Sequence, residues 1–103
     1  MLSFLKKLFK GNSVDLGQLI KEGAIIVDVR SKSEYASGHV KKSINIPLEQ
    51  VVSNVDTLKS YPHIVTCCRS GTRSGMAVRL LKSKGIKNIS NGGSWQNVNQ
   101  YIK

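Results

Sequence analysis

The chain has 103 residues, with 16 Lys and Arg against 6 Asp and Glu, and a formal net charge of +10. This length fits one domain, and two cysteines cannot build the disulfide framework of a small secreted protein. No apolar run approaches the ~20 residues that cross a membrane. The excess of basic residues suggests an anionic partner.

The positive charge lies toward the two ends of the chain. Residues 1–11 hold three lysines and no acid, residues 12–62 are neutral overall, and residues 63–103 hold seven basic residues and no acid. We therefore expect chemistry with anions in the C-terminal part. Nucleic-acid binding is disfavoured, because aromatic residues make up 6% of the chain and no basic-aromatic motif occurs.

Residues 1–12 form a basic amphipathic N-terminal segment. Apolar residues recur there at helical spacing, with Lys6 and Lys7 between them. These lysines, and the lack of a small-residue cleavage site, argue against a secretory signal. We expect the segment to pack on the domain that follows, residues 13–103. Contact of residues 1–10 with an anionic membrane surface is the alternative.

The sequence of the first half of the domain predicts short helices that alternate with two strands. Ser13 or Asp15 can cap the first helix, and Ser31 with Glu34 can form a capping box at the second. Residues 24–29 are almost all apolar and mostly β-branched, which is typical of a strand covered on both faces of a parallel sheet. The expected elements are a helix at 13–22, a strand at 24–29, a helix at 31–37, a strand at 43–46 and a helix at 48–60.

The second half continues the alternation. We expect a strand at 63–67, a polar loop at 68–73, a helix at 74–84, a strand at 86–90, a tight turn at 91–93 and a final helix capped by Ser94. Strands that alternate with helices predict an open α/β fold. Its sheet should be mainly parallel and four- to five-stranded, with helices on both faces.

The loop at 68–73, Cys-Arg-Ser-Gly-Thr-Arg, carries the main candidate site. In open α/β sheets ligands bind beyond the carboxyl ends of strands, where Cys68 falls. The following helix N-terminus and the charges of Arg69 and Arg73 favour the thiolate form of Cys68. Gly71 lets the loop curl, so that successive backbone N–H groups point inward and can bind an anion. These features predict a nucleophilic cysteine in an anion-binding loop.

Cys67 has a different interpretation. Alternation along the strand points it away from Cys68 and toward the core, as a small buried residue. A disulfide between these neighbours would be strained and is disfavoured. His39 and His63 lie far apart in sequence and belong to no cysteine motif, so we expect no metal and no cofactor.

Five short motifs occur in order along the chain: Asp28-Val29-Arg30, Glu34-Tyr35-x-x-Gly38-His39-Val40, Asn45-Ile46-Pro47, Cys68-Arg69-Ser70-Gly71-Thr72-Arg73-Ser74 and Gly92-Gly93-x-Trp95. Each is weak alone, but together they resemble the single-domain rhodanese family of thiosulfate or persulfide sulfurtransferases. The match covers nearly the whole chain after the N-terminal segment. One departure is Lys42-Ser43, where the family usually has Gly-Ala, and it touches local packing more than chemistry.

The resemblance implies a role for each residue of the loop. Cys68 would take sulfane sulfur from an anionic donor such as thiosulfate, carry it as a persulfide and pass it to a thiophilic acceptor. Backbone N–H groups of the loop would hold the persulfide, and the two arginines would attract the donor. The substrate-binding residues are therefore expected to be Arg69, Ser70, Gly71, Thr72 and Arg73, and Arg73 could also brace the loop.

Other residues of the motifs are expected to support the fold. Asp28 and Arg30 are interpreted as a structural ion pair rather than as catalysts, since charges at strand ends are usually satisfied internally. Glu34 and His39 are interpreted as helix-capping and packing residues. Trp95 should lie in the core or in a pocket wall.

Two alternatives stay open beside a sulfurtransferase. A non-enzymatic persulfide carrier or protein-interaction module would use the same Cys68. A Cys-based phosphatase or arsenate reductase fits less well, because only four residues separate Cys68 from Arg73 and no Asp general acid adjoins the loop. Phosphatases of this kind use a longer loop to enclose phosphate. We expect a cytoplasmic monomer that meets a small anionic sulfur donor and a protein sulfur acceptor.

Overall fold

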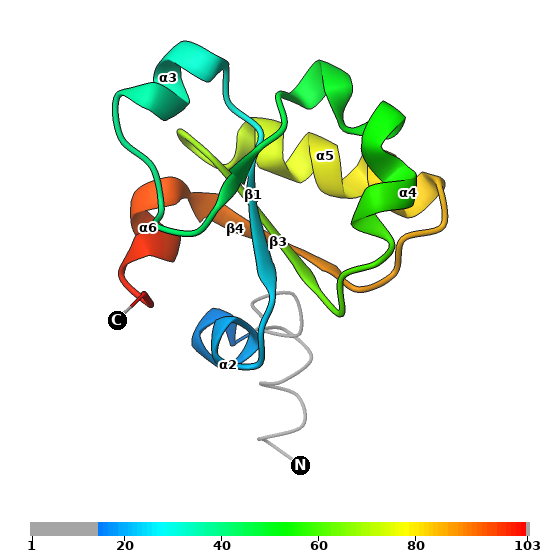
Figure 1. Ribbon diagram of the computed structural model, residues 1–103, viewed down its shortest axis with the longest axis horizontal. Coiled ribbons are helices and arrows are strands. Elements are labelled where there is room, and N and C mark those ends of the chain that lie inside the picture. Colours follow the sequence, from blue (N-terminus) through cyan, green and yellow to red (C-terminus); the bar gives the residue numbers. More distant parts are fainter. Residues whose placement is uncertain (1–14, 103) are drawn as a thin grey trace.

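Four parallel strands form one sheet in the part of the chain that the computed structural model describes, residues 15–102. The sheet order is β2-β1-β3-β4, with β1 at Ile25–Asp28, β2 at Ile44–Asn45, β3 at Ile64–Cys68 and β4 at Ile89–Ser94 (Figure 1). The expected parallel α/β sheet is confirmed. The predicted N-terminal segment lies outside the described residues.

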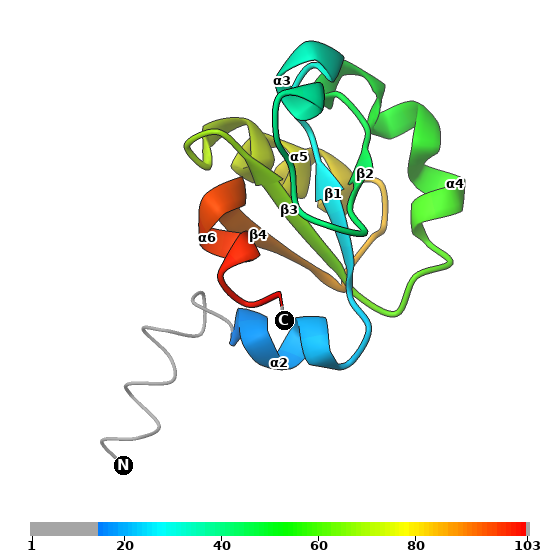
Figure 2. The same cartoon turned by 60° about the vertical axis from the view of Figure 1, so that its left-hand side comes forward.

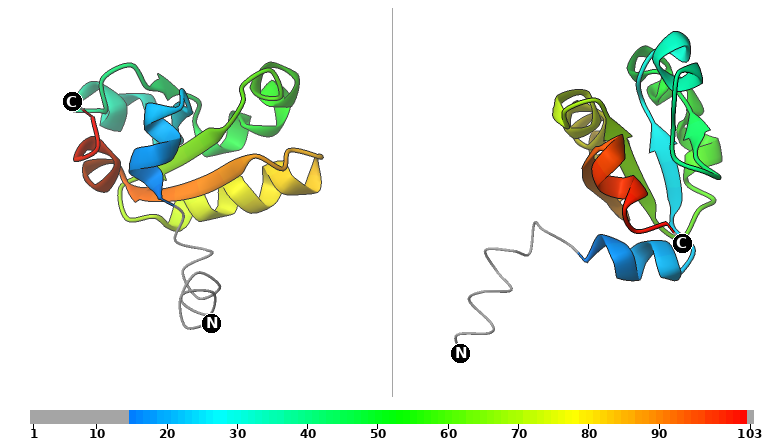
Figure 3. Two further views of the ribbon diagram at one scale, coloured as in Figure 1. Left: turned by 90° about the horizontal axis from the view of Figure 1, so that it is seen from below. Right: turned by 90° about the vertical axis from the view of Figure 1, so that its left-hand side faces the viewer.

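Helices cover both faces of this sheet. One face carries α5 (Thr72–Ser83), α4 (Val55–Leu58) and the 3-10 turns η1 (Leu48–Gln50) and η2 (Val52–Asn54). The other face carries α2 (Leu16–Lys21) and α6 (Trp95–Asn99), and Figure 2 shows these two helices on the side of the sheet away from α5. Short α3 (Lys32–Ala36) follows the carboxyl end of β1. Figure 3 shows α2 near the end where the strands begin and α3 at the opposite end.

Strand alternation separates two apolar cores. On β3, Ile64 and Cys68 pack against α4 and α5, whereas Val65 and Cys67 pack against α2 and α6. Both cysteines are free and buried. The prediction that neighbouring Cys67 and Cys68 point to opposite sides is therefore confirmed, and it follows from the two-residue period of a strand.

Three of the predicted helix caps are confirmed. Asp15 accepts a hydrogen bond from the Gln18 amide at 3.1 Å, and Ser94 accepts one from the Asn97 amide at 3.0 Å. Ser31 and Glu34 form the expected reciprocal capping box at α3.

Within residues 15–102, none of the helices has the length and apolar character needed to cross a membrane.

The predicted helix at 48–60 is wrong in its continuity. The segment forms η1, η2 and a single turn of α-helix, α4. Side chains explain the break, because the Ser53 hydroxyl and the side-chain Nδ2 of Asn54 both donate to the carbonyl of Gln50, at 2.9 and 2.8 Å. Such local side-chain bonds compete with the backbone hydrogen bonds of a continuous α-helix.

The predicted tight turn at 91–93 is also wrong, since these residues belong to β4. Thr66 pairs with Asn91, but Cys68 pairs with Ser94, so one residue of β3 faces two of β4. This arrangement is a β-bulge, formed by Gly92 and Gly93. Gly92 lies close to the backbone of the neighbouring strand β3, because a Cβ on Gly92 would lie 2.7 Å from the Thr66 carbonyl oxygen. The bulge ends β4 beside the cysteine loop.

Candidate active site at the end of strand β3

Cys68 is the last residue of β3, and α5 begins at Thr72. The connecting loop is therefore only three residues long, and the helix starts two residues earlier than the sequence predicts. Gly71 makes this short connection possible, because it adopts φ +101° directly before the helix. Added atoms would also be crowded there, since a Cβ on Gly71 would lie 3.3 Å from the Cα of Gly93.

Hydrogen-bond donors converge on the Cys68 sulfur. The backbone N–H of Gly71 lies 3.0 Å from Sγ, and the backbone N–H and hydroxyl of Ser74 each lie 3.4 Å from it. Burial by itself raises the pKa of the Cys68 thiol, but hydrogen bonds from Ser74, Gly71 and Ser70 outweigh it and lower the pKa below its ordinary value. The loop thus favours a thiolate at Cys68.

The neighbouring thiol of Cys67 has the opposite environment. It is fully buried on the other face of the sheet. Burial, together with the nearby carboxylate of Asp28, raises the pKa of Cys67 far above its ordinary value. Cys67 therefore stays protonated, so the two adjacent cysteines differ strongly in nucleophilicity.

Ser74 is a contact of the sulfur that the sequence analysis did not assign to the site. It is fully buried in the first turn of α5, and its hydroxyl donates to Asn91 Oδ1 at 2.7 Å. The sequence gives one indication of this contact. A small hydroxyl residue in the first turn of the helix that follows the loop can reach back to Cys68, which precedes the loop. Asn91 gives a weaker signal, because the bulge that places it was expected to be a turn.

The two loop arginines have different surroundings. Arg73 forms a two-pronged ion pair with Glu34 of α3, at 2.7 and 3.0 Å. This contact, with the bond from the Ser31 amide, lowers the pKa of Glu34 to about 2. Arg69 is exposed, and among residues 15–102 no carboxylate pairs with it. Ser70 and Thr72 have exposed side chains that contact each other at 3.4 Å.

Asp28 and Arg30 form the expected ion pair. The Arg30 guanidinium binds both carboxylate oxygens of Asp28, with a shortest distance of 2.7 Å, and both residues are buried. Arg30 also donates to the carbonyls of Glu34 and Gly38 and lies 5.2 Å from the centre of the Trp95 ring. The pair therefore joins the end of β1 to α3 and α6.

Other residues of the same motifs also fall near this edge. His39 stacks on Tyr35, with ring centroids 3.8 Å apart. A shallow pocket of about 230 Å³ adjoins the cysteine loop and is lined by Arg30, Glu34, Ser37, Arg69, Trp95 and Gln96. Trp95 is thus a pocket-wall residue that also packs on the second core. Within the described residues, no three His, Cys, Asp or Glu side chains gather as they would around a metal ion.

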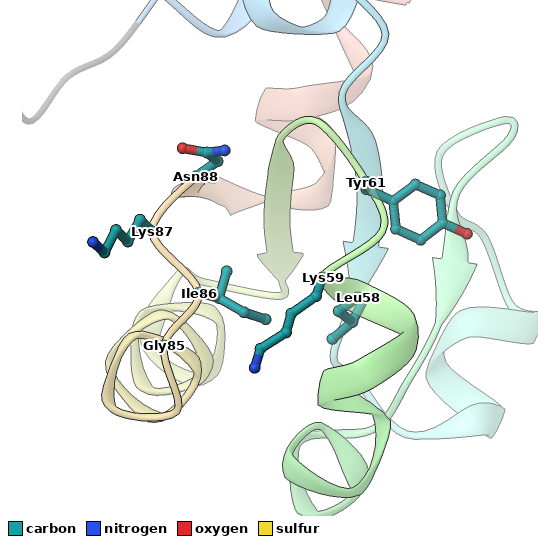
Figure 4. A pocket seen from close by; sticks show the side chains of 7 residues that line it. All are labelled: Leu58, Lys59, Tyr61, Gly85, Ile86, Lys87 and Asn88. Atoms are coloured by element: carbon teal, nitrogen blue, oxygen red, sulfur yellow. The ribbon is translucent and has the colours of Figure 1, made fainter.

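A different pocket, of about 250 Å³, lies at the opposite end of the sheet (Figure 4). It is lined by Leu58, the last residue of α4, and by residues of the two connections that lead from α4 to β3 and from α5 to β4: Lys59, Tyr61, Gly85, Ile86, Lys87 and Asn88. Figure 4 shows the Lys59 side chain extending toward Gly85 and Ile86, and the Lys87 side chain extending outward from the chain. Because this pocket lies at the amino ends of the strands, it is separate from Cys68.

Comparison with known proteins decides the family. A model of the rhodanese-like domain matches residues 12–100. The chain belongs to this family. The structure of the human single-domain sulfurtransferase TSTD1 matches this chain with a TM-score of 0.71 and 26% identity, and the match covers 86% of this chain and 93% of that one.

Curated relatives include proteins named as sulfurtransferases and as a sulfur carrier. The "Putative sulfur carrier protein YrkF" of Bacillus subtilis is 37% identical over 68% of this chain and 38% of its own length. The "Putative thiosulfate sulfurtransferase, mitochondrial" of Schizosaccharomyces pombe is 31% identical over 80% of this chain and 68% of its own length. The first relatives are longer proteins, of which this chain spans between 13% and 38%.

Proposed function

We propose that this rhodanese-like domain transfers sulfane sulfur through a persulfide on Cys68. One observation carries the proposal: the amides of Gly71 and Ser74 and the Ser74 hydroxyl all lie within 3.4 Å of the Cys68 sulfur. Such donors stabilise a thiolate and, after one sulfur atom is added, a persulfide anion beneath the same loop. Relatives with names of sulfurtransferases and sulfur carriers support the same chemistry.

The reaction has two balanced steps. The Cys68 thiolate attacks the sulfane sulfur of thiosulfate, and a new S–S bond forms while the S–S bond of thiosulfate breaks. Sulfite leaves with the electron pair of that bond. A nucleophilic acceptor, such as cyanide or a protein thiolate, then attacks the outer sulfur, and the electron pair of the Cys68 persulfide bond returns to Cys68 as a thiolate.

The surroundings of the loop support an anionic donor and assign different tasks to its arginines. Arg69, exposed and beside the 230 Å³ pocket, is proposed to attract the donor. Arg73 is held by Glu34, so we propose that it mainly fixes the loop. Asp28 and Arg30 are proposed as the brace below it, because both are buried and bound to each other.

The same geometry ranks a phosphatase below a sulfurtransferase. A phosphatase arginine must grip a phosphate oxyanion, but the guanidinium of Arg73 is already engaged by a carboxylate. The loop also closes directly on the sulfur, with the Gly71 amide at 3.0 Å. A loop that closes this tightly around the Cys68 sulfur suits one added sulfur atom better than a tetrahedral phosphate.

Incubation with thiosulfate, followed by intact-mass measurement, tests the proposal. We expect a gain of one sulfur atom in the protein and in the Cys67→Ser variant, and no gain in the Cys68→Ser variant. Reduction by dithiothreitol should remove the added atom. A protein that gains no sulfur, or gains it equally in the Cys68→Ser variant, contradicts the proposal.

A sulfur carrier is the second candidate, and the relative named as a sulfur carrier favours it. A carrier would load Cys68 in the same way but pass the sulfur to a protein thiol. Single-turnover release separates the two. The loaded protein should form thiocyanate rapidly with cyanide if it is a thiosulfate sulfurtransferase, and should release sulfur preferentially to a partner thiol if it is a carrier.

A further inference from the structure

The side chain of Asn91 joins three parts of the candidate site. Its Oδ1 accepts hydrogen bonds from the Ser74 hydroxyl at 2.7 Å and from the Gly93 amide at 2.9 Å. Its Nδ2 donates to the carbonyl of Gly71 at 3.1 Å. One residue of β4 therefore contacts the bulge, the cysteine loop and the first turn of α5.

The Ser74 hydroxyl has one hydrogen and two acceptors near it. Asn91 Oδ1 lies 2.7 Å from Ser74 Oγ, and Cys68 Sγ lies 3.4 Å from it. A Cys68 thiol can donate its own hydrogen to Ser74 Oγ while the hydroxyl hydrogen remains on Asn91. A Cys68 thiolate has no hydrogen to give, so the hydroxyl stabilises it only when it turns away from Asn91.

We infer that Asn91 is a positioning residue that competes with the Cys68 sulfur for the hydroxyl hydrogen of Ser74. When Cys68 is a thiolate, the hydrogen moves to the sulfur, and Asn91 Oδ1 keeps the Gly93 amide as a donor. When the sulfur is protonated, the hydrogen returns to Asn91. The competition concerns the nucleophile of the proposed sulfurtransferase, and it also applies to any other reaction that starts from the Cys68 thiolate.

The charged groups that the protein already has near the loop are unchanged in every variant that tests this inference, and Asn91→Asp adds one carboxylate. Arg73 is paired with Glu34, and Arg30 is paired with Asp28. Arg69 is exposed on the loop itself, and Cys67 faces the other side of the sheet. Asn91→Ala alters none of these groups and adds no charge, so its shift of the Cys68 titration can be assigned to hydrogen bonds.

The ultraviolet absorbance of the Cys68 thiolate, followed against pH with Cys68→Ser as the baseline, tests the inference. Asn91→Ala should lower the pKa of Cys68 by about half a unit to one unit, because the hydroxyl is released to the sulfur. Asn91→Asp, which is nearly isosteric, should raise it for two reasons: a carboxylate holds the hydroxyl more strongly, and its negative charge disfavours the thiolate. In a Ser74→Ala background only the effect of the charge remains, so the rise should be smaller there. A purely structural role would not make either shift depend on the Ser74 hydroxyl.

Two further variants complete the test. In a Ser74→Ala background the change Asn91→Ala should leave the pKa of Cys68 unchanged, because the shared hydroxyl is absent. Asn97→Ala is the matched control, since Asn97 holds the same bulge through the Gly92 carbonyl at 2.8 Å but does not contact Ser74. It should leave the pKa unchanged.

Shifts of Asn91→Ala and Asn91→Asp in the same direction, or an Asn91→Ala shift that persists without the Ser74 hydroxyl, overturn the inference. If Asn91→Ala fails to fold, Asn91→Asp decides instead: its pKa rise should be smaller in the Ser74→Ala background, and an equal rise in both backgrounds overturns the inference. The thiolate titration needs no sulfur donor, so its outcome is independent of the proposed function. Normal sulfur uptake with no opposing shifts would refute only the competition, and opposing shifts without sulfur uptake would refute only the sulfurtransferase.

Discussion

Arg69 and Arg73 carry the same charge and lie in the same short segment, yet their surroundings give them different uses. The guanidinium of Arg73 is bound by Glu34 from another helix, and Arg69 is exposed beside the pocket. A sequence pattern shows both charges but not which one is already paired. At the scale of single residues, the ion-pair partner therefore decides which charge is available to a substrate.

This difference predicts the kinetics of Arg69→Ala. The KM for thiosulfate should rise by up to about fivefold with little change in kcat, because exposed charge pairs contribute up to about 1 kcal/mol. Arg73→Ala should instead lower kcat, because Glu34 loses its partner and the loop loses its anchor. Steady-state thiocyanate formation measures both. An unchanged KM of Arg69→Ala at low salt would contradict the role proposed for Arg69.

The Glu34–Arg73 ion pair also joins two elements, α3 and the start of α5. Hydrogen bonds from Arg73 and Ser31 to the Glu34 carboxylate lower the pKa of Glu34 from 4.5 to about 2 in the folded protein. A carboxylate with a lowered folded-state pKa stabilises the fold above its unfolded-state pKa, and this stabilisation is lost as pH falls toward the folded-state value. The contribution is therefore present above about pH 4.5 and disappears toward pH 2.

We expect Glu34→Gln to lower the Tm at neutral pH. The Tm difference from the unsubstituted protein should stay constant above about pH 5 and shrink as pH falls from about 4.5 to about 2. Thermal unfolding by circular dichroism over this range provides the measurement. In an Arg73→Gln background most of the pH dependence should vanish. A difference that grows toward acid pH would show that the ion pair does not have this effect.

The bulge of β4 gives a second prediction at the scale of elements. A Cβ on Gly92 would lie 2.5 Å from Val98 Cγ2 and 2.8 Å from Val65 Cγ1, besides the Thr66 carbonyl. Gly92→Ala should therefore lower the stability by about 1–3 kcal/mol, as overpacking does, which corresponds to a Tm lower by roughly 5–20 °C.

Gly23→Ala is the control for the Gly92 prediction. Gly23 has φ +98°, but no atom lies within 4 Å of its added Cβ. Its cost comes from the backbone alone, on the order of 1–2 kcal/mol. If Gly92→Ala unfolds at the same temperature as the unsubstituted protein, the neighbours of the bulge can move aside, and the tight packing of β4 is not a constraint.

The elements show which features could be predicted from the sequence. The parallel sheet, the opposite orientation of Cys67 and Cys68, and the capping box at Ser31 depend on local periodicity and neighbouring residues, and the structure confirms them. The bulge of Gly92 and Gly93 depends on a register shift against β3. Contacts between distant segments produce that shift, and no local pattern of the chain encodes it.

The same distinction applies to the site. The loop and Cys68 lie in one continuous motif, so the sequence predicts where a nucleophile would sit. Ser74 and Asn91 form their contacts across 17 positions of the chain, and Glu34 reaches Arg73 across 39. Such pairs depend on how the elements pack, which the spacing of residues in one segment does not reveal.

At the scale of the whole molecule, the fold separates charges that are close in sequence. Residues 63–103 hold seven basic residues and no acid, but α5 carries the chain away from Cys68. This helix has 12 residues and is therefore about 18 Å long. Lys82 lies in its last turn, and Lys84 and Lys87 follow it toward the pocket of Figure 4. Their distance from Cys68 exceeds the Debye length of about 8 Å at physiological salt.

These distances predict how salt affects sulfur transfer from thiosulfate. The kcat/KM of the unsubstituted protein should fall as ionic strength rises, because salt screens the attraction between the anionic donor and the basic loop. A triple variant with Lys82→Gln, Lys84→Gln and Lys87→Gln should keep the same slope against ionic strength, although it loses three positive charges. Arg69→Ala loses only one charge, yet it should flatten the slope. If the triple variant flattens the slope as much as Arg69→Ala does, the donor responds to the net charge of the molecule, and the position of Arg69 beside the pocket has no special effect.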